Sequence, residues 1–418
     1  MKPGKVYVIG AGVSGLSAAV KLAKAGASIE LIEAAPQAGG RCRSYFDPTL
    51  GQVIDNGNHL VLSGNHAIYE YLRMIGAEDA LTGPKRAGAA FADLKTGEHW
   101  TIAPNEGPLA WWVLVKSRRV PGTHPGDYLE LAKLLFARPD QTIPDIISCK
   151  GPLWDRLMCH FLLAALNTEP KNASATLAGA IIRETLVRGG RAYRLRIATP
   201  NLSAAFIDPA LAFLKEKGAT VSFSRRLQRL VTNGEVLALE FGDGTVPVSG
   251  NDCVVLATPP WTTKELVPEI SAPDEFRAIV NAHFRIAPPP GTAPMIGVMG
   301  GAAEWIFSFA DRIAVTVSAA EALVDMERPA LAQLLWGDVA AVLGLPTTLP
   351  PWQIVKEKRA TFAATPAQDA KRPKTATRFP NLFLAGDWID TGLPATIEGA
   401  VRSGFRAAEL ALARTLYN

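Results

Sequence analysis

The 418-residue chain has few of the residues that build metal sites and disulfide frameworks. Its six histidines are scattered without an HExxH pattern, so we expect no metal site. The cysteines show no CxxC or zinc-ligand spacing, which predicts free, reduced thiols as in a cytoplasmic protein; there are four of them, Cys42, Cys149, Cys159 and Cys253.

Long apolar runs and basic runs are also missing. No stretch approaches the roughly 18 apolar residues of a spanning helix. The chain enters its first predicted strand by Lys5, which leaves no room for a signal peptide and again favours the cytoplasm. The net charge of +4 is mild, and no basic run is interleaved with aromatic residues, which argues against a nucleic-acid partner. The length suggests two or three domains.

The most informative stretch is residues 5–33, which predicts a strand, a glycine turn, a helix and a second strand. The apolar run Val6–Ile9 leads into the motif Gly10-Ala11-Gly12-Val13-Ser14-Gly15, and the second strand ends in Glu33. Glycines at these positions allow a tight turn, a close approach to a pyrophosphate and close helix packing. The phosphates are expected at the helix N-terminus and ribose hydroxyls at the glutamate. This unit predicts a dinucleotide site without separating NAD from FAD.

Two further elements bear on that choice. A glycine pair precedes an arginine at Gly39-Gly40-Arg41, where bare N–H groups and a guanidinium can face the same pyrophosphate. Near the far end, the apolar run at 382–384 closes on Gly386-Asp387 and leads into a helix start after Pro394. An NAD fold has no need of this second glycine-acid element.

Together, these elements resemble the flavin-containing amine oxidase and phytoene desaturase superfamily. The resemblance implies FAD as cofactor and an α/β fold, in which a Rossmann-like FAD-binding domain is joined to a mixed α+β substrate domain. The implied FAD-binding segments are 1–64, 199–260 and 379–418. The implied substrate-domain segments are 65–198, mostly helical, and 261–378.

Three motifs are similar to a narrower group, the squalene-associated flavoproteins. They are Asp55-Asn56-Gly57-Asn58-His59, the LN-T-x-P segment ending at Pro170, and GDWIDTGLPATIEGA over 386–400. The group's activity implies that hydride from reduced FAD replaces the hydroxyl of hydroxysqualene, a C30 isoprenoid, to give squalene for hopanoid synthesis. An electron donor of unknown identity and upstream synthases of the squalene pathway are the implied partners.

The resemblance also implies site residues. His59 and Asp390 are the predicted proton donors for the departing hydroxyl; alternatively, His59 only caps its turn. The predicted FAD contacts are Gly10, Gly12, Val13, Ser14, Gly15, Glu33, Ala34, Gly39, Gly40, Arg41, Asn56, Gly57, Leu227, Thr258, Gly386, Asp387, Pro394, Ala395, Thr396 and Ile397.

Residues 65–190 have a helical pattern without notable strand alternation. This region contains two apolar runs, Gly107–Val115, which includes a tryptophan pair, and Tyr128–Phe136. Cations follow the first run and interrupt the second. Such runs suit peripheral contact with a membrane surface, on the inner face of the cytoplasmic membrane, or ordinary core helices.

Other functions stay open at this stage. A carotenoid-type desaturase would run hydride from a polyene to oxidised FAD. An amine oxidase is disfavoured because no lysine expected near the flavin can be identified. A non-catalytic prenyl-lipid carrier on the same fold is disfavoured because every phosphate-binding element is intact.

Overall fold

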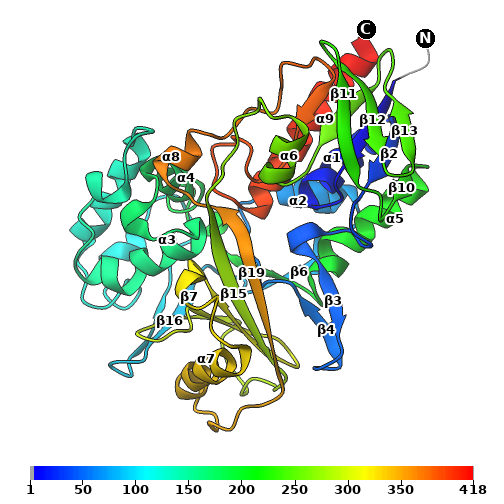
Figure 1. Cartoon of the computed structure of the whole chain (residues 1–418). Helices are drawn as coiled ribbons and strands as arrows, with labels where there is room; N and C mark the ends of the chain where they lie inside the picture. Colours follow the sequence, from blue (N-terminus) through cyan, green and yellow to red (C-terminus); the bar gives the residue numbers. More distant parts are fainter. Residues whose placement is uncertain (1–3, 418) are drawn as a thin grey trace.

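The computed structural model describes residues 4–417, and its first layer is a five-stranded parallel sheet of order β10-β2-β1-β14-β20. Chain segments far apart in sequence supply it (Figure 1): β1 (Lys5–Ile9), β2 (Ser28–Ile32), β10 (Thr220–Ser222), β14 (Cys253–Leu256) and β20 (Leu382–Leu384). The short apolar runs of β1 and β14 are fully or nearly fully buried, as expected for a parallel sheet covered on both faces. The predicted strand, turn, helix and strand are confirmed.

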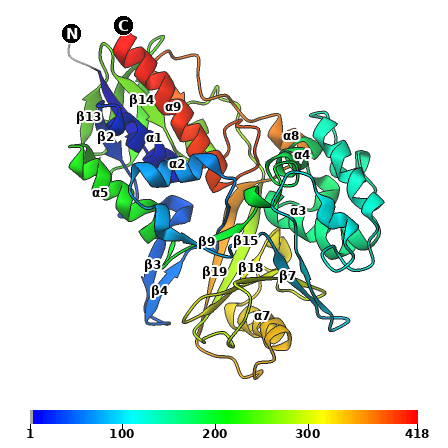
Figure 2. The same cartoon turned by 180° about the vertical axis from the view of Figure 1, so that it is seen from behind.

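Helices cover this sheet. The first is α1 (Val13–Lys24), which follows the glycine turn, and α9 (Ile397–Tyr417) packs against it, as Figure 2 shows. Two more belong to the same core, α2 (His66–Met74) and α5 (Asp208–Glu216). After residue 226 two hairpins form the antiparallel sheet β11 (Leu227–Thr232), β12 (Val236–Phe241) and β13 (Gly244–Pro247).

A seven-stranded mixed sheet of order β19-β15-β18-β17-β16-β7-β8 forms a second layer. Its strands are β7 (Ala89–Asp93), β8 (His99–Ile102), β15 (Phe276–Phe284), β16 (Met295–Met299), β17 (Trp305–Ser308), β18 (Ile313–Val317) and β19 (Trp352–Phe362). One face packs on α7 (Arg328–Leu343), and the other faces the helical part of the chain.

The expectation that residues 65–190 contain no strand is wrong. β7 and β8 form a hairpin there, and β6 (Leu81–Thr82) also falls in this stretch. The cause is that β7 reads Ala-Ala-Phe-Ala-Asp and β8 is only four residues long, so neither shows apolar alternation. β7 is specified by its pairing with β16 from the second half of the chain, and β8 in turn pairs with β7 at the edge of the sheet.

The rest of 65–190 is helical but irregular. Its α-helices are α3 (Cys159–Leu166) and α4 (Ala175–Glu184), and a π-helical turn at Trp154–Met158 leads into α3. The two apolar runs form 3₁₀ helices, at Trp111–Leu114 and Pro125–Phe136.

The remaining elements connect the layers. The hairpin β3 (Ser44–Asp47) and β4 (Gln52–Asp55) extends from the parallel sheet, and β5 (Leu60–Leu62) and β6 pair on either side of β9 (Leu195–Ala198). Short helices α6 (Pro260–Leu266) and α8 (Pro366–Asp369) follow β14 and β19. Strands from the predicted FAD-binding segments share the parallel sheet; the exact domain boundaries stay a prediction.

Candidate cofactor and active site

Two glycine loops meet above the N-terminus of α1. Gly39 N–H donates to the Ala11 carbonyl over 2.8 Å, and a Cβ on Gly40 would lie 3.5 Å from the Cα of Gly12. Gly10 and Gly39 have φ values of 107° and 108°, a conformation that favours glycine. The two loops therefore present bare backbone to one space, as the sequence predicted for a pyrophosphate site.

The space above Gly12 is open. A Cβ on Gly12 would meet nothing within 4 Å, and no side chain caps α1. By contrast, a Cβ on Gly15 would lie 1.8 Å from the Gly10 carbonyl oxygen, so Gly15 serves close packing. The free N–H groups at the start of α1, with Val13 and Ser14, are suited to bind an anion.

Arg41 and Asp387, 346 residues apart, form an ion pair of 2.6 Å between Nη2 and Oδ1. Nη1 of Arg41 also donates to the Ala360 carbonyl at the end of β19. The Arg41 side chain keeps 41% of its accessible surface, so the pair with Asp387 does not close it off from solvent. The predicted arginine loop and the predicted Gly386-Asp387 element thus face each other.

The adenosine end of the predicted site is built around Glu33. Its carboxylate accepts from the N–H groups of Ala11 and Ala35 over 2.7 and 2.8 Å, which ties the first glycine loop to the exposed segment at Ala34. The backbone N–H of Arg225 donates to the Glu33 carbonyl. This bond brings buried Leu227, the first residue of β11, to the same end of the site as Glu33. A carboxylate accepts further bonds, so the ribose contact of Glu33 stays a prediction.

The Gly-Asp element is held by α9 and by the loop after β14. Gly386 N–H donates to Ser403 Oγ over 2.8 Å, and Trp388 Nε1 donates to the carbonyl of Thr258, which directly follows the Gly10-facing residue Ala257. The helix predicted near Ala395 begins at Ile397, because Thr396 Oγ1 accepts from Gly399 N–H and caps it. Pro394 and Ala395 therefore lie in the loop before α9.

Sequence reasoning missed what the rest of the EGAxxSG motif does. Glu398 is buried, and its carboxylate accepts from Ala67 N–H and Ile68 N–H, so it caps α2. A Cβ on Gly404 would lie 2.2 Å from the Ser14 carbonyl oxygen, so this glycine lets α9 cross α1 closely. The motif therefore places the start of α9; these two residues are not predicted ligands.

The segment 55–59 crosses the face of the seven-stranded sheet opposite α7. Asn58 Nδ2 donates to Thr316 Oγ1 over 3.1 Å, and Thr316 Oγ1 donates to Asn281 Oδ1 over 2.8 Å. A Cβ on Gly57 would lie 3.2 Å from Asn281 Nδ2. Asn56 Nδ2 lies 3.5 Å from Glu357 Oε2 on β19. Asn281 was not predicted, although a polar residue inside the apolar run of β15 was a signal that could have found it.

A buried ionic cluster supports this crossing. Arg312 Nη2 lies 3.4 Å from Asp55 Oδ2, with both side chains 5% exposed. His283 Nε2 donates to the Asp55 carbonyl over 3.0 Å. Burial and the charge of Arg312 together lower the pKa of His283 to about 3, so the imidazole is neutral.

The two predicted proton donors differ in their surroundings. His59 Nε2 lies 3.8 Å from the position of a Cβ on Gly57. Burial lowers the pKa of His59 and favours the neutral imidazole, while the charges of Asp55, Arg41 and Asp387 also reach it. Asp390 pairs with Lys374 and accepts from Gly392 N–H. Burial raises the pKa of Asp390, but Lys374, Arg372 and the Gly392 N–H together lower it below its usual value, so its carboxyl is ionised at neutral pH. Both assignments stay predictions.

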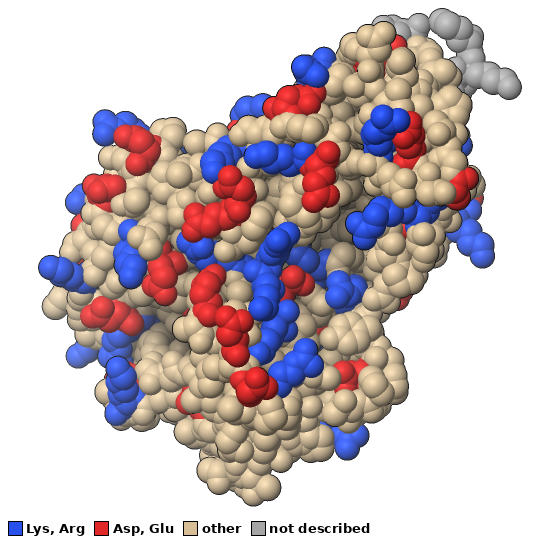
Figure 3. All heavy atoms as spheres, viewed as in Figure 1, with Lys and Arg blue, Asp and Glu red and all other residues tan. Residues whose placement is uncertain are grey.

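The side chains and backbone groups of this site match the chemical groups of FAD. Bare backbone above Gly12, the α1 N-terminus and Arg41 suit a pyrophosphate, and Asp387 suits a polyol hydroxyl. Figure 3 shows Lys and Arg side chains around the hollowed middle of this face, where the seven-stranded sheet meets the parallel sheet. No group of three or more potential metal ligands occurs within residues 4–417. These features define an FAD-dependent oxidoreductase.

Comparison with known proteins agrees. The chain belongs to the family "Flavin containing amine oxidoreductase", which it matches over residues 13–412. It is 53% identical over 410 residues to a hydroxysqualene dehydroxylase of Rhodopseudomonas palustris, covering 98% of both chains. It is 50% identical over 414 residues to a hydroxysqualene dehydroxylase of Sinorhizobium fredii, covering 99% of both chains.

Solved structures show the same fold. Cyclohexylamine oxidase from Brevibacterium oxydans superposes with a TM-score of 0.72 at 15% identity, over 98% of this chain and 99% of that one. The predicted α/β class with a Rossmann-like FAD-binding domain is confirmed. Among the helices in the described part of the chain, none is both long and apolar enough to cross a membrane.

Proposed function

We propose that this protein removes the hydroxyl of hydroxysqualene reductively to give squalene. The observation that carries the proposal is the near full-length identity of 47–53% to three proteins named hydroxysqualene dehydroxylase. When bound in its reduced form, FAD supplies the hydride that replaces the hydroxyl on the allylic carbon. The chain's own residues must hold the polyene, exclude water and deliver a proton to the departing oxygen.

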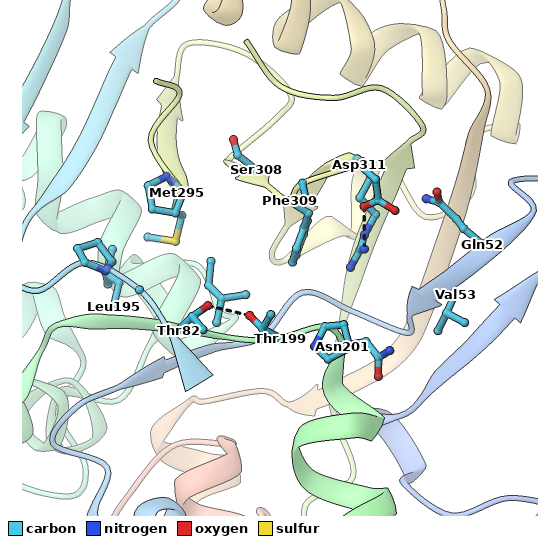
Figure 4. Close-up of a pocket in the computed structure, with 17 residues that line it drawn as sticks. Gln52, Val53, Thr82, Leu195, Thr199, Asn201, Met295, Ser308, Phe309 and Asp311 are labelled. Carbon is cyan, nitrogen blue, oxygen red and sulfur yellow. Dashed lines mark hydrogen bonds and ion pairs between the residues drawn. The ribbon is translucent and has the colours of Figure 1, made fainter. Parts of the chain in front are cut away.

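A cavity of about 590 Å³, whose lining is mostly apolar but includes Asp311 and Arg312, suits part of a polyene chain. It lies between β9 and the β17–β18 turn, and Figure 4 shows Leu195, Met295 and Phe309 around it. Val53 on β4 also lines it, two residues before Asp55 of the segment that crosses the seven-stranded sheet. The cavity therefore lies near Asn56 and Gly57, which are predicted FAD contacts, as a substrate with long apolar arms requires.

This proposal includes the FAD contacts predicted from the sequence and the predicted proton donors His59 and Asp390. His59 is the better placed of the two, because the charges of Arg41 and Asp387 reach it. The pKa values of His59 and Asp390 are both lowered, so the imidazole is neutral and the carboxyl is ionised near pH 7. Neither form is a good proton donor. The electron donor is not identified by any residue, and the upstream synthases enter only as suppliers of the substrate.

We also propose peripheral contact with a membrane, through what we term the 109–136 surface. Its apolar side chains are at least one-third exposed: Leu109, Trp111, Leu114, Val115, Leu129 and Phe136. Elsewhere, exposed Phe46 and Val53 pair across the β3–β4 hairpin near exposed Phe223, and the other large exposed apolar residues lie on separate elements. The segment lies at the left edge of Figure 1, in cyan, on the outer side of the helical part.

The 109–136 surface combines a rigid base with positive charge. Trp112 is 2% exposed and its ring lies 5.3 Å from that of Tyr128, which joins the two 3₁₀ helices. The Arg118 guanidinium lies 4.7 Å from the ring centre of exposed Trp111, and Lys116 and Lys133 are nearby in sequence. Exposed apolar side chains beside cations suit an anionic lipid surface, where an apolar substrate would also reside.

The competing activity is desaturation. A probable zeta-carotene desaturase of Synechococcus elongatus is 23% identical over 98% of this chain, which is a distant likeness. The direction of electron flow separates the two activities. Under anaerobic conditions, a desaturase would bleach oxidised flavin when mixed with phytoene, whereas the proposed enzyme would reoxidise reduced flavin when mixed with hydroxysqualene.

A further inference from the structure

The cavity of about 590 Å³ has a polar end and an apolar end. In the view of Figure 4, Gln52 and Asp311 lie on one side of Phe309, whereas Leu195 and Met295 lie on the other. A purely apolar ligand would leave the groups at the polar end without partners, which costs binding free energy. The lining therefore suits a ligand that has an apolar body and a polar group.

Three buried polar atoms of the cavity lining have no hydrogen-bond partner within residues 4–417. The first is Nε of Arg312, a side chain that is only 4% exposed. The others are Nε2 of Gln52 on β4 and the hydroxyl oxygen of Ser308 at the end of β17. Buried polar groups in proteins are almost always hydrogen-bonded. A hydroxyl on a ligand can accept from the two nitrogens and donate to a serine oxygen.

The charge of Arg312 is already balanced by the protein. Its Nη2 lies 3.4 Å from Asp55 Oδ2, and its Nη1 lies 3.6 Å from Asp311 Oδ1. The guanidinium also lies 3.9 Å from the ring centre of Phe309, another residue of the cavity lining. Since two carboxylates face one guanidinium, a carboxylate or phosphate on a ligand would meet no excess positive charge. The polar end therefore favours a neutral oxygen group over an anion.

The polar end of the cavity adjoins the segment that contains two predicted FAD contacts. Arg312 directly precedes β18 and pairs with Asp55. Further along β18, Thr316 Oγ1 accepts from Asn58 Nδ2 over 3.1 Å. Residues 55–58 therefore run along β18, and the two predicted FAD contacts of this segment lie between the two attachment points. A ligand group held at Arg312 is thus at the edge of the predicted cofactor site.

We propose that Arg312 and Gln52 bind the hydroxyl of hydroxysqualene at the polar end of the cavity and so select the substrate over its product. This inference rests on the proposed function. Arg312 Nε and Gln52 Nε2 donate to the hydroxyl oxygen, and an apolar arm of the polyene extends toward Leu195 and Met295. The reaction removes the hydroxyl and with it both hydrogen bonds. Squalene therefore binds more weakly than the substrate, which favours its release.

The test measures the dissociation constants of radiolabelled hydroxysqualene and squalene for the full-length protein with oxidised FAD, which has no hydride to transfer. The wild type should bind hydroxysqualene about 10-fold or more tightly than squalene, because a charged donor bonds the hydroxyl. Gln52→Leu, which keeps the size but removes the donor, should weaken hydroxysqualene binding about 3- to 10-fold and leave squalene binding unchanged. Gln333→Leu, the same change on the exposed face of α7, should alter neither constant.

Arg312→Lys gives a second variant. Lysine keeps a positive charge beside Asp55 but lacks the Nε donor, so FAD content and Tm should stay close to the wild type while the preference for hydroxysqualene falls. Equal affinities of the wild type for the two ligands, or an equal loss for both ligands in Gln52→Leu, would overturn the inference even if the reduced wild type forms squalene. A wild type that prefers hydroxysqualene but leaves it intact when its flavin is reduced would overturn the proposed function instead.

Discussion

The guanidinium of Arg41 and the carboxylate of Asp387 lie 2.6 Å apart, although one belongs to the first loop after β2 and the other to the loop after β20. Their pairing brings the two ends of the chain to one cleft. An anion at the glycine loops and a hydroxyl at Asp387 would both be within reach of these side chains, which is what binding FAD across the cleft requires.

The first prediction concerns this pair. Arg41→Ala should weaken FAD binding by about 10- to 100-fold, because a charge-assisted hydrogen bond contributes about 1.5–3 kcal/mol. Arg41→Lys should recover only part of the loss, since lysine lacks the planar fork. The dissociation constant is measured by titrating flavin-free protein with FAD. Arg229→Ala breaks a surface pair with Glu240 and should leave the constant unchanged; equal losses in both variants would contradict the assignment.

The two glycines at the start of α1 should respond differently to the same substitution. Gly12→Ala adds a Cβ into open space, so the flavin-free protein should keep its Tm but lose most FAD affinity. Gly15→Ala places the Cβ 1.8 Å from the Gly10 carbonyl oxygen, so the fold itself should be destabilised. Thermal melts with and without FAD decide this. A Gly12→Ala protein that binds FAD normally would show that the pyrophosphate lies elsewhere.

The buried imidazole of His283 should make stability depend on pH. Burial lowers its pKa to about 3, below the value of about 6.5 in an unfolded chain. The unfolded state therefore binds more protons between these values, and stability is lost as pH falls from about 6.5. His283→Gln should flatten this part of the profile of unfolding free energy in urea. An unchanged slope between pH 6.5 and 4 would show that other groups cause the loss.

The membrane proposal predicts a matched contrast between surfaces. The double variant Leu114→Glu and Phe136→Glu should no longer float with anionic vesicles, because it replaces apolar side chains that are 68% and 83% exposed. Val187→Glu with Leu334→Glu alters exposed apolar residues outside the 109–136 surface and should float like the wild type. If neither the wild type nor the control floats with vesicles, the surface does not bind lipid.

Much of the cofactor cleft could be predicted from the sequence, because its residues carry local signals. Gly10, Gly39 and Asp387 stand where a turn, a close approach or a strand end requires them. The sequence could not reveal that β7 joins the seven-stranded sheet, since that strand is specified by its partner β16.

The most direct test is anaerobic single turnover of hydroxysqualene by the dithionite-reduced protein, with flavin absorbance and hydrocarbon product followed together. We predict that squalene forms in step with the return of the oxidised flavin spectrum, one molecule per flavin. A flavin that stays reduced while the substrate remains intact would contradict the proposed function and turn attention to the desaturase direction, with phytoene-like polyenes as the next substrates.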